Sequence, residues 1–115
     1  MKKKNRLLTN KDFKSVLDKK NSVSCGEFVI YSKKNDLNYS RIGISVSSKI
    51  GNSVVRHKIK RQISEMVRNN FNLECGVDIV IIARNKFLSN DFTKNEEKMK
   101  KMLVGLSKWE GKKYE

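Results

Sequence analysis

The chain has 115 residues, and its 26 Lys and Arg against 12 Asp and Glu give a formal net charge of +14. A chain of this length can bury one core without disulfides or metal ions, and so large a positive charge usually serves a polyanionic partner. The sequence has no apolar stretch near the roughly 20 residues of a membrane-spanning helix, and no apolar signal-peptide core follows its basic N-terminus. We therefore expect a cytoplasmic protein of one domain over residues 1–115, frayed at 1–6 and 110–115, with a nucleic-acid partner.

The two cysteines and the one histidine do not suggest a metal site. Cys25 and Cys75 lie far apart, without a Cys-x-x-Cys spacing, whereas structural zinc needs about four ligands. We predict that both cysteines are reduced, and we predict no metal ligand and no catalytic residue in the chain.

A first helix is predicted from Thr9 to about residue 20. Thr9 and Asp12 have the spacing of a capping box, and Leu8 and Phe13 that of a hydrophobic staple. The apolar positions 13, 16 and 17 then form one stripe at helical spacing.

Two strands are predicted next, at residues 28–31 and 41–46, with a polar turn at 33–36 between them. The second strand alternates: Ile42, Ile44 and Val46 point to one face, and Arg41, Gly43 and Ser45 to the other. That second face can be open to solvent or to a ligand.

Gly51-Asn52-Ser53 is a turn and N-cap signal, and a helix is predicted over 52–70. A strand over 77–84 that is apolar on both faces, and a last helix, follow. A capping box at 93–96 opens this last helix, which has one apolar side formed by Met99, Met102, Leu103, Leu106 and Trp109. The residue pattern alone gives the order αββαβα, an α+β sandwich.

The helix at 52–70 carries the strongest functional signal. Val55, Ile59, Ile63 and Met66 fall on one side at 3.6 residues per turn. Its basic residues number five against the single acid Glu65, so salt bridges within the helix cannot neutralise them. Residues 1–20 hold eight basic residues against two acidic ones, a second focus of charge. Two focused basic segments favour a phosphate-binding surface over a merely solvated one.

Residues 46–61, VSSKIGNSVVRHKIKR, resemble the signature of the bacterial ribonuclease P protein family. In that family a strand ends in a Ser-Lys-Lys-like stretch, and Gly-Asn-Ala-Val and a helix of the type Arg-Asn-Arg-x-x-Lys-Arg follow. Further landmarks match in the right order from about Lys4 to Leu106: Arg6-Leu7, Asp12-Phe13, the strands at 28–31 and 41–46, and DIVIIAR at 78–84.

The chain departs from the family pattern at four positions. His57 stands where the family usually has Asn, Lys58 replaces Arg, and Ser64 stands where a basic residue is common. Leu17 replaces an aromatic residue one turn after Phe13. The first three departures reduce the expected RNA contacts of the basic helix, and the fourth removes one residue from the expected aromatic surface. The family pattern is still present.

The resemblance implies a two-layer αβββαβα sandwich with a left-handed crossover around the basic helix. It also implies a protein subunit of an endoribonuclease whose RNA subunit removes the 5′ leader of precursor tRNA, with Mg²⁺ bound mainly by that RNA and the substrate. The implied partners are ribonuclease P RNA and precursor tRNA, with no DNA and no membrane. The residues implied for the catalytic RNA are Lys49, Asn52, Arg56, His57, Lys58, Lys60, Arg61 and Arg68, and those for the leader are Arg6, Phe13, Leu17 and Tyr31.

From the residues alone, other functions stay open. A generic RNA-binding module, such as a ribosome-associated protein, fits the composition and charge equally well. A protein-only nuclease is disfavoured because no carboxylate cluster that could hold two catalytic metal ions is visible. His57 has no acid at i±3 or i±4 to orient it, so we interpret it as exposed or RNA-contacting rather than as a general base.

Overall fold

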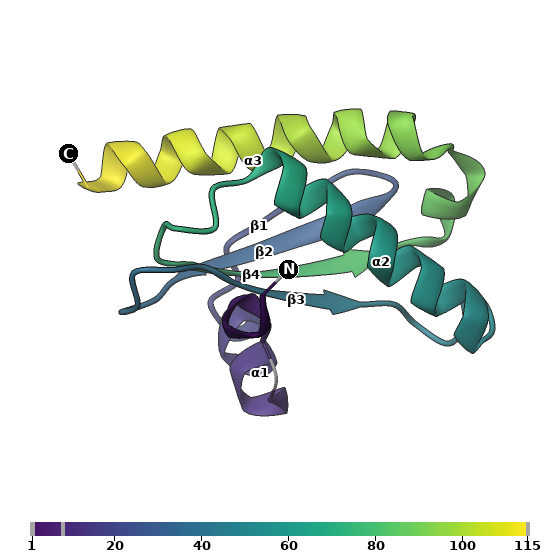
Figure 1. Ribbon diagram of the computed structural model, residues 1–115, viewed down its shortest axis with the longest axis horizontal. Coiled ribbons are helices and arrows are strands. Elements are labelled where there is room, and N and C mark those ends of the chain that lie inside the picture. The colour runs from purple at the N-terminus through teal and green to yellow at the C-terminus, as the bar shows by residue number, and fades with distance from the viewer. Residues whose placement is uncertain (1, 8, 115) are drawn as a thin grey trace.

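The computed structural model describes residues 2–7 and 9–114, with side chains as far as Val104, and its α+β fold confirms the predicted class (Figure 1). Leu8 of the predicted staple and the side chains of Leu106 and Trp109 lie outside the described part. The elements are η1 (Lys3–Asn5), α1 (Asn10–Asp18), β1 (Ser22–Ser24), β2 (Phe28–Lys34), β3 (Arg41–Ser45), α2 (Ser53–Asn70), β4 (Val77–Ala83), η2 (Asn85–Ser89) and α3 (Phe92–Tyr114).

The main elements follow the αβββαβα order that the resemblance implied. The residue pattern alone missed β1, because all three of its residues are exposed and no apolar alternation marks it. It also ended β2 too early. Lys33 and Lys34 belong to the strand rather than to the turn, since their pairing with Asp78 and Val77 of β4 continues the antiparallel ladder.

The four strands lie in the order β1-β2-β4-β3. β2 runs antiparallel to β4, whereas β3 and β4 are parallel and are joined through α2, which forms the crossover. This topology makes β3 an edge strand, and Arg6 forms a parallel bridge with its residue Ile42.

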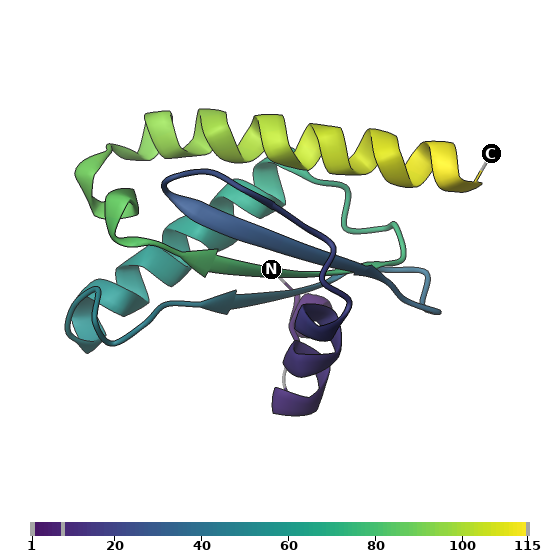
Figure 2. The ribbon, with the colours of Figure 1, turned by 180° about the vertical axis from the view of Figure 1, so that it is seen from behind.

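Helices cover both faces of the sheet: α2 and α3 lie over one face and α1 over the other, so α1 adds a layer to the two-layer sandwich that was expected (Figures 1 and 2). The main core lies beneath α2 and α3 and confirms the predicted apolar stripe of α2, since Ile59, Ile63 and Met66 are almost fully buried. β4 is buried on both faces, as its continuous apolar run predicted.

The smaller cluster beneath α1 is built around Val16 and Val80, both fully buried. Gly43 of β3 belongs to this face and is buried as well, because the ring of Phe13 lies against it. The face of β3 that the alternation left open to solvent or ligand is therefore covered in part by α1.

Side-chain caps fix the starts of the three α-helices. The hydroxyl of Thr9 accepts the N–H of Asp12 at 3.1 Å, and the amide oxygen of Asn52 accepts the N–H of Val55 at 3.0 Å, so both predicted caps are confirmed. The capping box predicted at 93–96 is wrong. Asp91 accepts the N–H of Lys94 at 2.9 Å, and Asn95 turns inward to donate to the carbonyl of Phe87 at 3.0 Å.

A buried carboxylate ties the start of β2 to the C-terminal part of the fold. Glu27 is fully buried, and its Oε2 accepts hydrogen bonds from Lys98 and from Asn90, each at 2.7 Å. The hydrogen bond from the Lys98 ammonium is the main cause that lowers the pKa of Glu27 to about 2. Nothing in the sequence pattern had marked Glu27 as an interior residue.

This network predicts a specific pH dependence for Glu27→Gln. Because the folded-state pKa is lowered from 4.5, the carboxylate contributes stability that is complete above pH 4.5 and is lost as the pH falls towards 2. We expect the gap in unfolding free energy between wild type and variant, on the order of 3 kcal/mol at neutral pH, to close across that window. Denaturation at several pH values measures it, with the exposed Glu97→Gln as control. A gap that stays constant from pH 7 to pH 2 would contradict the assignment.

Candidate nucleic-acid interface

The outward face of α2 forms one wall of a groove of about 430 Å³. His57, Lys60, Arg61 and Arg68 line it from α2, and Arg6 joins them from the N-terminal segment. The remaining lining residues are Ser64 and Glu65, so cations dominate the groove. The structure thus brings together four of the eight residues predicted for the basic helix and one predicted for the leader.

The other residues predicted for this surface lie outside the groove lining. Lys49 and Lys58 are exposed, and Arg56 is half-buried on the flank of α2. Asn52 is exposed as well, and its amide oxygen caps the start of α2.

The charge of the α2 face is available to a ligand. Among the described residues, the ion pairs within 4 Å join Arg41 to Asp12 and Asp78, and Lys98 to Glu27. None of these pairs uses a cation of α2. Lys and Arg that are exposed and not internally paired are the groups that bind backbone phosphates and release counterions.

The N-terminal segment is held on the edge of β3, and this places Arg6. Asn5 is buried and donates to the carbonyl of Ser40 at 2.7 Å, while the N–H of Leu7 donates to the carbonyl of Ile42 at 3.1 Å. Arg6, between these two anchors, therefore lines the groove beside α2. The sequence had suggested a frayed end here and gave no indication of this proximity.

A second groove of about 320 Å³ continues the first along the edge of β3. Arg6, Lys60 and Ser64 line both grooves, so the two are joined. Phe13 lines it from α1, and Ile42, Gly43 and Ile44 line it from β3. A cationic groove therefore leads directly into one with an aromatic side chain, the combination that binds single-stranded nucleic acid.

Tyr31 and Leu17 do not line this second groove. Like Phe13, both are half-buried and pack against the cluster of Leu7, Val16 and Val80 beneath α1. Of the four residues predicted for the leader, Arg6 and Phe13 therefore line the groove, whereas Leu17 and Tyr31 share only the apolar cluster with Phe13.

The contact between Phe13 and Gly43 predicts a thermodynamic coupling. A Cβ on Gly43 would lie 2.5 Å from Cζ of Phe13, so the ring must move when Gly43→Ala is introduced. We expect this variant to lower the unfolding free energy by about 1–3 kcal/mol, and we expect no such loss when Phe13→Ala is also present.

Gly26→Ala is a suitable control for this cycle, because its Cβ would meet only the flexible side chain of Lys86. Chemical denaturation of the four members of the cycle measures the coupling. If Gly43→Ala lowered the unfolding free energy equally in the wild-type and the Phe13→Ala background, the predicted contact between the Phe13 ring and Gly43 would be contradicted.

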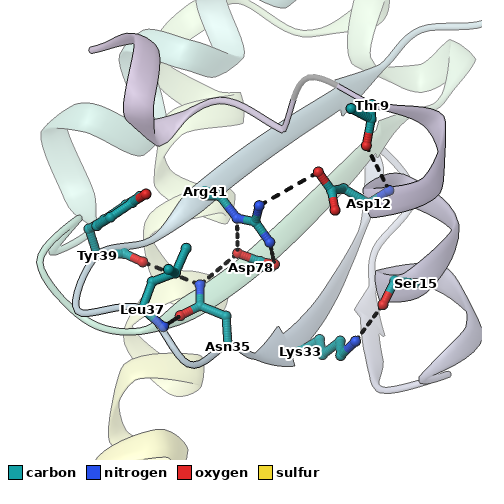
Figure 3. A network of polar contacts seen from close by, with 9 residues as sticks. All are labelled: Thr9, Asp12, Ser15, Lys33, Asn35, Leu37, Tyr39, Arg41 and Asp78. Carbon is teal, nitrogen blue, oxygen red and sulfur yellow. Dashed lines mark hydrogen bonds and ion pairs between the residues drawn. The ribbon is translucent and has the colours of Figure 1, made fainter.

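A polar network fixes α1 on the sheet (Figure 3). Arg41 of β3 donates through Nε and Nη2 to the two carboxylate oxygens of Asp78, at 3.0 and 2.6 Å, and its Nη1 lies 3.6 Å from Asp12 of α1. Asn35 adds a hydrogen bond to Asp78 at 2.7 Å, and Lys33 donates to the hydroxyl of Ser15. The bidentate bond to Asp78 is the main cause that raises the pKa of Arg41.

Sequence reasoning missed this network as a determinant of the site. Arg41 and Asp78 are the first and second residues of two neighbouring parallel strands, and they are paired in register. A charged residue at the start of each of two predicted strands was the available signal, but their adjacency depends on the strand order.

The fold and the grooves define a class of molecule: a small, basic α+β protein with a cation-lined groove between its crossover helix and its N-terminal segment. Residues 1–107 match the family model described as Ribonuclease P. The ribonuclease P protein component of Mesoplasma florum is 42% identical over 106 residues, which cover 90% of this chain and 96% of that protein. That of Clostridium botulinum strain 657 is 41% identical over 111 residues, covering 95% and 96%.

Solved structures agree with these relatives. An RNase P protein mutant of Staphylococcus aureus with defective mRNA degradation activity has a TM-score of 0.80 and 32% identity, over 92% of this chain and 90% of that one. The RNase P protein from Thermotoga maritima has a TM-score of 0.75 and 34% identity, over 85% and 94%. The chain belongs to the ribonuclease P protein family.

Three further properties concern the part of the chain that the structure describes. None of its helices is long and apolar enough to span a membrane. Its His, Cys, Asp and Glu side chains form no group of three or more that could hold a metal ion. Cys25 and Cys75 are free thiols, as predicted.

Proposed function

We propose that this protein binds the catalytic RNA of ribonuclease P and the 5′ leader of precursor tRNA, and thereby assists removal of the leader. The observation that carries the proposal is the junction of two grooves: the unpaired cations of α2 lead into the groove lined by Phe13. In this proposal the RNA subunit cuts the phosphodiester bond between leader and tRNA, so the protein supplies no catalytic residue. The expected location is the cytoplasm, where tRNA is processed in bacteria.

The two grooves suit two different RNA ligands. The exposed cations of α2, with Arg61 and Arg68 able to bind two phosphate oxygens each, suit the backbone of a folded RNA. The groove of Phe13 suits a single strand, because stacking on an aromatic ring accepts any base and contributes about 1–3 kcal/mol per base. A protein that must accept every precursor tRNA requires contacts of this sequence-tolerant kind.

Magnesium is assigned to the RNA subunit and the substrate in this proposal. The described carboxylates do not gather into a site, and several are engaged with cations, as Asp78 is with Arg41 and Glu27 is with Lys98. The protein residues act by neutralising phosphate charge and by orienting the strand.

The division of roles is tested by substrate binding to the reconstituted holoenzyme, with precursor tRNA and mature tRNA compared. Phe13→Ala should weaken binding of the leader-bearing substrate by about ten-fold and leave mature tRNA unchanged, because one stacking contact is lost. Tyr31→Ala should act in the same direction with a smaller effect, since Tyr31 does not line the groove of Phe13. Equal losses on both substrates would remove these residues from the leader site.

A further inference from the structure

A hollow of about 560 Å³ lies beside α1 and shares no lining residue with the two grooves next to α2. Lys11, Lys14, Ser15, Asp18 and Lys19 line it from α1 and its C-terminal end, and Lys33 lines it from β2. We call this surface the lysine hollow. Its helix, α1, packs on the face of the sheet opposite α2 and α3 (Figure 2).

The charge of the lysine hollow is largely unopposed. Lys11, Lys14 and Lys19 are exposed, and none of them belongs to an ion pair of the described residues. Asp18 is the one acid in the lining, while Asp12, the other acid of α1, faces Arg41 instead.

The start of α3 provides a contrast within the same chain. Lys94, Lys100 and Lys101 are also exposed, but Glu96 and Glu97 stand between them in the sequence, and the nearby Lys98 is paired with Glu27. Positive charge is therefore concentrated in the lysine hollow and diluted on α3, which makes the hollow a candidate for binding an anion with several charges.

We propose that the lysine hollow binds backbone phosphates of single-stranded RNA, namely the part of the leader that extends beyond the groove of Phe13. This inference rests on the proposed function. Phe13 lines the groove and Lys14 lines the hollow, and consecutive residues lie about 100° apart around a helix. A strand stacked on Phe13 reaches the lysines by crossing α1, whose diameter with side chains is about 10–12 Å.

Lysine ammonium groups on flexible stems attract phosphates without selecting a base. Ser15 adds a hydroxyl that already accepts from Lys33 and retains a proton to donate to a phosphate oxygen. The hollow would therefore increase the affinity for long leaders irrespective of their sequence.

The test uses holoenzyme reconstituted with ribonuclease P RNA and a series of precursor tRNAs whose leaders increase in length at random sequence. The variant is Lys11→Gln/Lys14→Gln/Lys19→Gln. The matched control is Lys94→Gln/Lys100→Gln/Lys101→Gln on α3, which removes the same charge from exposed lysines. Dissociation constants are measured at several salt concentrations.

For the longest leaders we expect the α1 variant to bind about ten-fold more weakly and to lose about two units of salt slope, while short leaders and the α3 control bind as wild type does. Equal losses from the two triple variants, or equal losses on short and long leaders, would overturn the proposal. If the wild-type protein gained no affinity from any leader, the proposed function itself would fail. If the wild-type protein gained affinity from the leader and the α1 variant bound every leader as tightly as wild type, the role of the lysine hollow would be rejected and the proposed function would stand.

Discussion

Replacing Lys60, Arg61 and Arg68 together by glutamine is expected to weaken binding to ribonuclease P RNA by about 100-fold at moderate salt and to reduce the salt slope by about two to three units. These three cations line the same groove on α2 and have no ion-pair partner among the described acids. Each phosphate contact that is lost also removes the release of its counterion. Arg61→Gln alone should reduce the slope by about one unit.

The measurement is the dissociation constant at four or more salt concentrations, and the α3 triple variant is again the matched control. Because both triple variants remove the same charge, any effect of overall charge appears equally in both. A slope that is unchanged in the α2 variant, or reduced equally in the control, would contradict the placement of the catalytic RNA on α2.

Arg41→Ala is expected to lower the free energy of unfolding by about 3–5 kcal/mol, because it breaks a largely buried ion pair. The side chain of Asp78 is only 5% exposed, and removal of Arg41 leaves its charge with the single hydrogen bond from Asn35. A buried carboxylate without its cation is strongly destabilising.

Asp12→Asn is the informative comparison, because it removes the other partner of Arg41. Asp12 lies 3.6 Å from Arg41, with a side chain 34% exposed, so its loss should cost less than about 1 kcal/mol. Denaturant titration of both variants measures the difference. Similar losses from both would mean that the bond between Arg41 and Asp78 contributes no more than an exposed ion pair.

The sequence predicted what depends on neighbouring residues. The cap at Asn52 and the buried side of α2 follow from local spacing, and the structure confirms both. The continuous apolar run of β4 likewise predicted a strand buried on both faces. These features depend on residues that are close in the sequence, so a single sequence is enough to predict them.

The sequence could not predict what depends on distant pairings. The burial of Glu27 requires Lys98 of α3, and the position of Arg6 requires the anchoring of Asn5 and Leu7 on β3. In each case the deciding contact joins elements whose adjacency the local pattern does not contain.

The most direct test of the proposed role is leader removal from precursor tRNA by a bacterial ribonuclease P RNA at low magnesium, where the RNA alone is slow. The protein should restore accurate cleavage at the 5′ end when it is mixed with the RNA, and it should cleave nothing by itself. If the mixture remained as slow as the RNA alone while the protein still bound RNA, the role in leader removal would be contradicted. The grooves along α2 and β3 would then belong to a general RNA-binding protein.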